Sequence, residues 1–87
     1  MTQLTSMPNI GSTLSVKLEK IGVTSKEMLE DLGSENAIIR IATLDNRGVC
    51  INMLYALEGA IQGIRWNSLS SERKAELLDF FNSLSLK

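Results

Sequence analysis

The segment from Val49 to Trp66, VCINMLYALEGAIQGIRW, restricts the possible folds more than any other part of the chain. At about 100° per residue, its large apolar side chains lie on one stripe of an α-helix, and residues with almost no bulk lie opposite. The large side chains belong to Cys50, Met53, Leu54, Leu57, Ile61 and Ile64. The small face consists of Asn52, Ala56, Gly59, Ala60 and Gly63, and the polar strip between the faces consists of Tyr55, Glu58, Gln62 and Arg65.

A helix with these two faces can be packed against on both sides. Glycine inside a helix costs up to about 1 kcal/mol relative to alanine, so we expect close packing to compensate for Gly59 and Gly63. The segment is therefore predicted to be the central, mostly buried helix. Within it, Cys50 is expected to pack in the core, Glu58 to form hydrogen bonds or ion pairs, and Trp66 to close the end of the core.

Capping residues and apolar spacing predict four further helices. The first covers residues 12–20, with Ser12 as N-cap and Gly22 as C′ residue. The second covers 26–32, with Thr24 or Ser25 as N-cap and Gly33 at its end. The third covers 35–44 with Ser34 as N-cap, and the last extends to about residue 84 with Ser70 or Ser71 as N-cap. The last helix carries a heavy apolar face formed by Leu77, Leu78, Phe80, Phe81 and Leu84.

The first residues of the chain favour a turn. Thr5 or Ser6 could cap a very short helix before Pro8, and residues 8–11 are predicted to form a tight turn because asparagine and glycine tolerate positive φ. No strand-like alternation occurs in the sequence. The expected fold class is all-α, a compact domain of five to six helices that covers residues 1–87 as a single unit.

Composition limits the classes of function. The 87 residues carry a net charge of −1, so the chain as a whole does not attract nucleic acid or anionic membranes. It has no histidine, the commonest general base and metal ligand, and no motif for a nucleophile, a metal or a phosphate loop. We therefore expect no catalytic residue, no cofactor and no metal. No signal peptide or membrane span is recognisable, which favours a cytoplasmic protein.

Residues 7–22, MPNIGSTLSVKLEKIG, resemble a helix-hairpin-helix motif. In this motif a tight hairpin exposes backbone N–H groups to a DNA phosphate, and the positive end of the helix dipole favours an anion. The predicted DNA-binding residues are Asn9, Ile10 and Gly11 through their backbones, Ser12 and Thr13 through their hydroxyl groups, and Lys17 through its charge.

The alternative is that the hairpin only orients two helices. Asn9 stands where such motifs usually carry glycine, and Thr13 stands where many carry a basic residue. Residues 1–26 contain three lysines and one glutamate, a net charge of only +2. A phosphate contact with so little charge would be weak and easily lost in salt.

The central segment NMLYALEGAIQGIRW, followed by a short polar break and an amphipathic helix, resembles the C-terminal domain of the TfoX/Sxy competence regulators. The opening PNIG…LEKIGV…LEDLG is similar to the start of the same domain, so the resemblance covers about residues 4–84. Fuller members of that family carry an additional N-terminal domain. Because this chain starts directly with the C-terminal type of module, it is expected to be a stand-alone form.

The resemblance implies regulation of DNA-uptake genes alongside the cyclic-AMP receptor protein at promoters. Two functions are therefore considered. One is a regulatory accessory module, linked to transcription and transformation competence, that contacts the DNA backbone weakly through residues 9–13. The other is a protein–protein interaction module, monomeric or homodimeric, without nucleic-acid binding. An enzyme is not expected.

Overall fold

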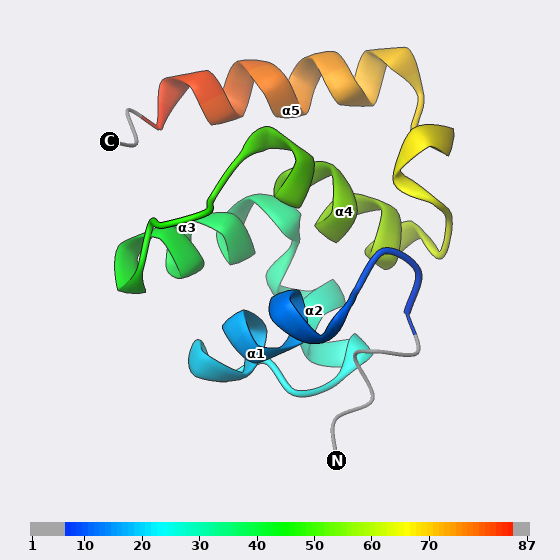
Figure 1. The fold of residues 1–87 in the computed structure, drawn as a ribbon. Helices are drawn as coiled ribbons and strands as arrows, with labels where there is room; N and C mark the ends of the chain where they lie inside the picture. The colour runs from blue at the N-terminus through cyan, green and yellow to red at the C-terminus, as the bar shows by residue number, and fades with distance from the viewer. Residues whose placement is uncertain (1–6, 85–87) are drawn as a thin grey trace.

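The computed structural model describes residues 7–84, and every regular element among them is helical (Figure 1). The elements are α1 (Ser12–Lys20), α2 (Lys26–Leu32), α3 (Ser34–Leu44), α4 (Ile51–Gln62), the 3₁₀ turn η2 (Trp66–Ser68) and α5 (Ser71–Ser83). The predicted all-α class is confirmed. The helix considered for Thr5 or Ser6 lies outside the described residues. No helix among residues 7–84 is long and apolar enough to cross a membrane.

Helix α4 lies at the centre of the arrangement, as its large apolar face and its opposite small face predict. It packs against α2, α3, α5 and η2, and Figure 1 shows α5 crossing on one side of it and α1 and α2 on the other. Leu54, Leu57 and Ala60 have no exposed surface. Burial of a large apolar side chain such as Leu54 or Leu57 stabilises a fold by about 2 kcal/mol, so α4 contributes substantially to the core.

The central helix is shorter than predicted, because it begins at Ile51 and ends at Gln62. Gly63 has a φ of +76° and lies in the left-handed region. The Gly63 N–H donates to Ala60 O at 3.2 Å and the Ile64 N–H donates to Gly59 O at 2.9 Å, the two hydrogen bonds of a Schellman motif. The prediction that Gly63 lies inside the helix is therefore wrong, since this glycine terminates it.

Cys50 also lies outside the helix, as its N-cap residue, and its side chain is exposed. The prediction that Cys50 packs in the core is wrong, because the helical spacing used to place it does not apply before the helix begins.

Local capping signals set most of the other helix ends. The hydroxyl groups of Ser25 and Ser70 accept hydrogen bonds from Met28 N and Arg73 N, as expected of N-caps. Ser34 and Ser12 are not N-caps. Each is the first residue of its helix, and a glycine precedes it at the cap position.

The C′ glycine of α1 is confirmed. Gly22 has a φ of +88°, and the N–H of Val23 donates to Leu18 O at 2.9 Å. Val23 and Leu18 are both buried. Their apolar contact is the one that usually accompanies this kind of helix end, and it directs the chain from α1 towards α2.

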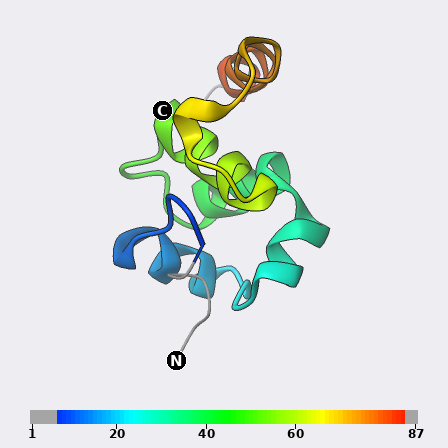
Figure 2. The same cartoon turned by 90° about the vertical axis from the view of Figure 1, so that its right-hand side faces the viewer.

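Helix α5 lies on the outside of the molecule and packs on α4 (Figures 1 and 2). Leu77 is its only buried residue, whereas Leu78 keeps 42% of its surface exposed. Phe80, Phe81 and Leu84 are half-buried and pack against the edge of the core. The apolar face predicted for this helix is therefore only partly covered within residues 7–84.

Candidate nucleic-acid interface

The turn at residues 7–10 precedes α1 and has the predicted tight form. Pro8 and Asn9 occupy its two central positions, and the Ile10 N–H donates to Met7 O at 3.4 Å. Asn9 has a φ of +69°, the only positive φ outside glycine among the described residues. Proline fixes φ for the first central position of such a turn, and asparagine tolerates the left-handed second position.

The side chain of Asn9 fixes this turn to the end of α4. Its Nδ2 donates to Ile64 O at 3.0 Å, and its Oδ1 accepts from Trp66 N at 3.1 Å. We call this pair of hydrogen bonds the Asn9 clasp. Met7 and Ile10 flank the clasp with buried side chains. In Figure 1 the blue turn accordingly lies beside the loop that leaves α4.

Gly59 makes the clasp possible. A Cβ atom at this position would lie 2.6 Å from Asn9 Nδ2 and 2.9 Å from Ile64 O, both closer than any normal contact. The expectation that close packing compensates for a glycine inside the central helix is confirmed at this residue.

The next residues, Gly11, Ser12 and Thr13, are exposed. They form the start of α1, where Gly11 is the N-cap and no side chain caps the helix. An open groove runs from this first turn to the first turn of α4 and is lined there by Cys50, Asn52 and Met53. Two helix N-termini therefore meet at one groove, and both favour negative charge through their N–H groups and dipoles.

Lys17 lies one turn further along α1. Its Nζ donates to the backbone carbonyl of Arg47 at 3.3 Å, which ties α1 to the loop between α3 and α4. In that loop Arg47 pairs with Asp45 through two hydrogen bonds of 2.9 and 3.0 Å. These bonds hold the pKa of Asp45 well below its usual range, so the loop adds no net charge beside Lys17.

The six residues predicted to bind DNA are thus divided by the structure. Gly11, Ser12 and Thr13 share an exposed surface with the cation of Lys17 at its edge. Asn9 and Ile10 hold the turn in place through a side-chain clasp and a buried side chain. The long-range role of Asn9 has no local signal in the sequence, because its partners lie 55 and 57 residues away.

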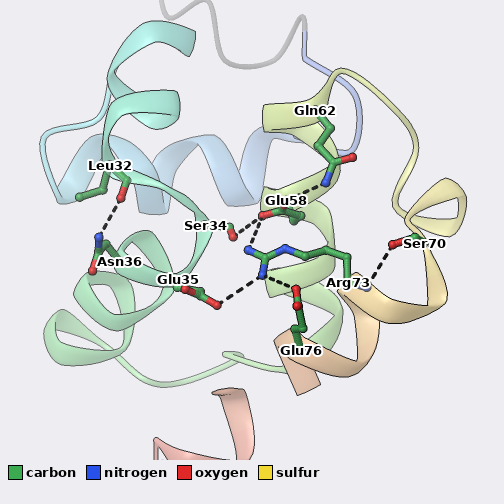
Figure 3. A network of polar contacts seen from close by, with 9 residues as sticks. All are labelled: Leu32, Ser34, Glu35, Asn36, Glu58, Gln62, Ser70, Arg73 and Glu76. Atoms are coloured by element: carbon green, nitrogen blue, oxygen red, sulfur yellow. Dashed lines mark hydrogen bonds and ion pairs between the residues drawn. The ribbon is translucent and has the colours of Figure 1, made fainter. Parts of the chain in front are cut away.

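A second polar cluster joins α3, α4 and α5 (Figure 3). Glu58 accepts hydrogen bonds from Ser34 Oγ at 2.6 Å, Gln62 Nε2 at 2.7 Å and Arg73 Nη2 at 3.2 Å. Arg73 also contacts Glu76 at 3.1 Å and Glu35 at 3.7 Å. The predicted hydrogen-bonding and ion-pairing role of Glu58 is confirmed, and the cluster fixes the beginning of α5 to the central helix.

Burial raises the pKa of Glu58, but the hydrogen bonds from Arg73, Ser34 and Gln62 outweigh burial and bring the pKa below its usual value. The hydrogen bond to Glu58 in turn raises the pKa of Arg73. Both groups are therefore charged in the native protein at neutral pH.

Acidification is expected to remove the stabilisation that Glu58 provides. Its native pKa is lowered relative to that of an unfolded chain, so the contribution is complete above the unfolded-state pKa and is lost as the pH falls through the native pKa. Urea unfolding at a series of pH values from neutral to acid should show the loss, and Glu58→Gln should make the curve flatter. Glu19→Gln is the control, because Glu19 is exposed and its carboxylate forms no ion pair within residues 7–84. An unchanged slope in Glu58→Gln would contradict the role of the cluster.

Trp66 does not close the end of the core, contrary to prediction, because α4 ends four residues before it. Its surface is 45% exposed. The Tyr55 and Trp66 rings are nearly parallel, with centroids 6.3 Å apart, and Lys74 Nζ lies 5.4 Å from the Trp66 ring centroid.

Among residues 7–84, no group of three acidic, cysteine or histidine residues could hold a metal ion.

Comparison with known sequences gives a family and two relatives. A sequence model of the TfoX C-terminal domain matches residues 1–81. The chain is 32% identical over 85 residues to protein Sxy of Escherichia coli and 27% identical over 84 residues to the DNA transformation protein TfoX of Haemophilus influenzae. These alignments cover 98% and 97% of this chain but only 40% and 38% of the relatives, so the chain spans about two fifths of their length.

Two crystal structures from Listeria monocytogenes are similar over nearly the whole chain. An uncharacterized protein in a triclinic form is 47% identical, has a TM-score of 0.90 and aligns over 93% of this chain and 91% of its own. A protein of unknown function in a tetragonal form is 46% identical, has a TM-score of 0.91 and aligns over 95% of this chain and 100% of its own.

Proposed function

The chain belongs to the TfoX C-terminal domain family, and from that premise we propose that it is a regulatory accessory module linked to transcription and transformation competence. One of its relatives is named a DNA transformation protein. In this proposal the module contacts the DNA backbone weakly and does not read sequence. A transcription regulator such as the cyclic-AMP receptor protein is its proposed partner at promoters, and no enzymatic activity is proposed.

The contact is assigned to the start of α1. The observation that carries it is that Gly11, Ser12 and Thr13 are exposed at a helix N-terminus without a side-chain cap. The backbone N–H groups and the two hydroxyl groups would donate to a phosphate, and Lys17 would add charge. Asn9 and Ile10 act as positioning residues in this proposal, because they hold the turn that precedes the contact.

Gly11→Asp is expected to separate DNA binding from folding. Gly11 has open space around its Cβ position and a φ of −93°, so a side chain fits without strain. Aspartate is a good N-cap and changes stability by only a few tenths of a kcal/mol relative to glycine. Aspartate, however, places a negative charge where the phosphate would lie, so we expect Gly11→Asp to lower the affinity for duplex DNA by about tenfold or more.

The matched control is Gly11→Ala, which adds a side chain in the same open space with neither a charge nor a capping oxygen and should retain most of the affinity. Binding is measured with a labelled duplex at low salt, together with backbone amide shifts at residues 11–13 that fade as salt is added. Equal affinities for the two variants, or shifts centred elsewhere, would contradict this contact.

The second candidate function is a protein-interaction module without nucleic-acid affinity. It is favoured by the exposed apolar side chains Leu44 and Leu78, at 58% and 42%, and by the half-buried phenylalanines of α5. This candidate would be selected if the amide shifts at residues 11–13 do not change on addition of DNA and sedimentation experiments show a dimer.

A further inference from the structure

A second surface with chemistry suited to nucleic acid lies where η2 leads into α5. We define the aromatic–basic patch as Tyr55, Arg65, Trp66 and Lys74. Trp66 is nearly half-exposed, and tryptophan, with its large ring and polar N–H, is enriched at surfaces that bind partners. Parallel rings with centroids 6.3 Å apart are strongly offset, so Tyr55 covers only part of the Trp66 ring.

The patch is positively charged although the chain as a whole is not. Within residues 7–84, neither Arg65 nor Lys74 forms an ion pair with a carboxylate, whereas Arg73 touches three. The acidic residues of α5 are Glu72, Glu76 and Asp79. At 3.6 residues per turn they lie about 140° or more around the helix from Lys74, so the helix keeps its acids away from this patch.

Lys74 can be displaced from the ring that it covers. Within the described residues, the only partner of its ammonium group is the Trp66 ring, at 5.4 Å, and cation–π contacts at exposed sites are weak. A flat base could therefore take the position over the ring while the ammonium group turns to a phosphate. Stacking on an aromatic ring beside a cation is the way in which proteins hold unpaired bases without reading their sequence.

We propose that the aromatic–basic patch binds single-stranded nucleic acid, with one unpaired base stacked on Trp66 and the backbone paired with Arg65 and Lys74. The patch is held in place by the Asn9 clasp, since Oδ1 of Asn9 accepts from Trp66 N. It is distinct from the duplex contact at Gly11, Ser12 and Thr13 and does not depend on it. An acidic protein segment is the competing occupant of such a surface.

Fluorescence tests the proposal directly, because Trp66 is the only tryptophan of the chain. At low salt, oligothymidylate should quench Trp66 emission saturably, and it should bind several-fold more tightly than a duplex of equal length. Polyglutamate of similar charge should neither quench nor compete. Absence of quenching, equal affinity for the duplex, or equal quenching by polyglutamate would each overturn the proposal.

Variants supply the second arm of the test, with affinity read from a labelled oligothymidylate and folding checked by circular dichroism. Trp66→Leu should lower the affinity about tenfold, the size of effect typical of one stacked base, and Trp66→Phe should restore part of it. Lys74→Glu should also weaken binding, whereas Lys20→Glu on α1 makes the same charge change away from the patch and should not. Loss of binding in Lys20→Glu equal to that in Lys74→Glu would overturn the proposal.

Gly11→Asp distinguishes the two proposals. It should weaken duplex binding as described above and leave the quenching by oligothymidylate unchanged, so either proposal can fail alone. A parallel loss of quenching in folded Gly11→Asp would show that the patch is not an independent site.

Discussion

Gly59→Ala is expected to lower the free energy of unfolding by about 2 kcal/mol, although helix propensity alone predicts a gain of up to about 1 kcal/mol for this change. The added Cβ would lie 2.6 Å from Asn9 Nδ2, 2.9 Å from Ile64 O and 3.2 Å from Trp66 Cα. Two of these neighbours are backbone atoms, which cannot relieve the clash by a change of side-chain rotamer. Overpacking of this kind costs about 1–3 kcal/mol, and opening the clasp would forfeit two hydrogen bonds of about 1 kcal/mol each.

Urea or thermal unfolding measures the effect, and two further variants show that it comes from the clasp. Gly11→Ala adds a Cβ in open space and should cost less than about 1 kcal/mol. In an Asn9→Ala background the 2.6 Å contact is gone, so Gly59→Ala should cost clearly less than in the native chain. If Gly59→Ala instead stabilises the protein, the clasp is not closed in solution.

Leu77→Ala is expected to destabilise the protein by about 3 kcal/mol. Leu77 has no exposed surface and is the only residue of α5 that is buried. Replacing such a leucine by alanine loses the free energy gained when its methyl groups leave water. A second loss comes from the cavity that remains in the core. Because α5 rests on α4 and has no other buried anchor, its amides should also exchange hydrogen faster than those of α3 and α4.

The matched control is the neighbouring leucine. Leu78→Ala removes the same atoms from a side chain that is 42% exposed, and the loss should be well below half of that for Leu77→Ala. Denaturant unfolding compares the two variants, and hydrogen exchange locates the change. Equal losses for the two leucines would mean that the side of α5 turned towards the core has been assigned wrongly.

The helix ends show how much of the fold local chemistry decides. Ser25, Ser70 and Gly22 cap their helices as predicted, because each acts on backbone groups within five residues of itself. The burial of Leu54 and Leu57 follows from their spacing within one helix. Spacing failed at Cys50 and Trp66, since it assumes a helix that begins only after Cys50 and ends before Trp66.

The candidate site was less predictable than the fold. The sequence pattern predicts a helix that begins after a tight turn. The exposure of Gly11, Ser12 and Thr13 agrees with this prediction. The side chain of Asn9 was assigned no partner, because the atoms that it binds belong to the far end of the chain. The aromatic–basic patch was not predicted either, since it combines residues from α4, η2 and α5.

The all-α class, the order of the helices, most of their caps and the central place of α4 follow from the amino-acid sequence. These features depend on interactions between residues a few positions apart, and the spacing of apolar and capping residues along the chain indicates such interactions. Three long-range contacts become visible only in the folded chain: Asn9 fastens the first turn to Ile64, Ser34 binds Glu58 instead of capping a helix, and Arg73 holds α5 in place. Those contacts join residues 15 to 55 positions apart, and a polar side chain becomes specific for such a partner only when packing has brought the two together.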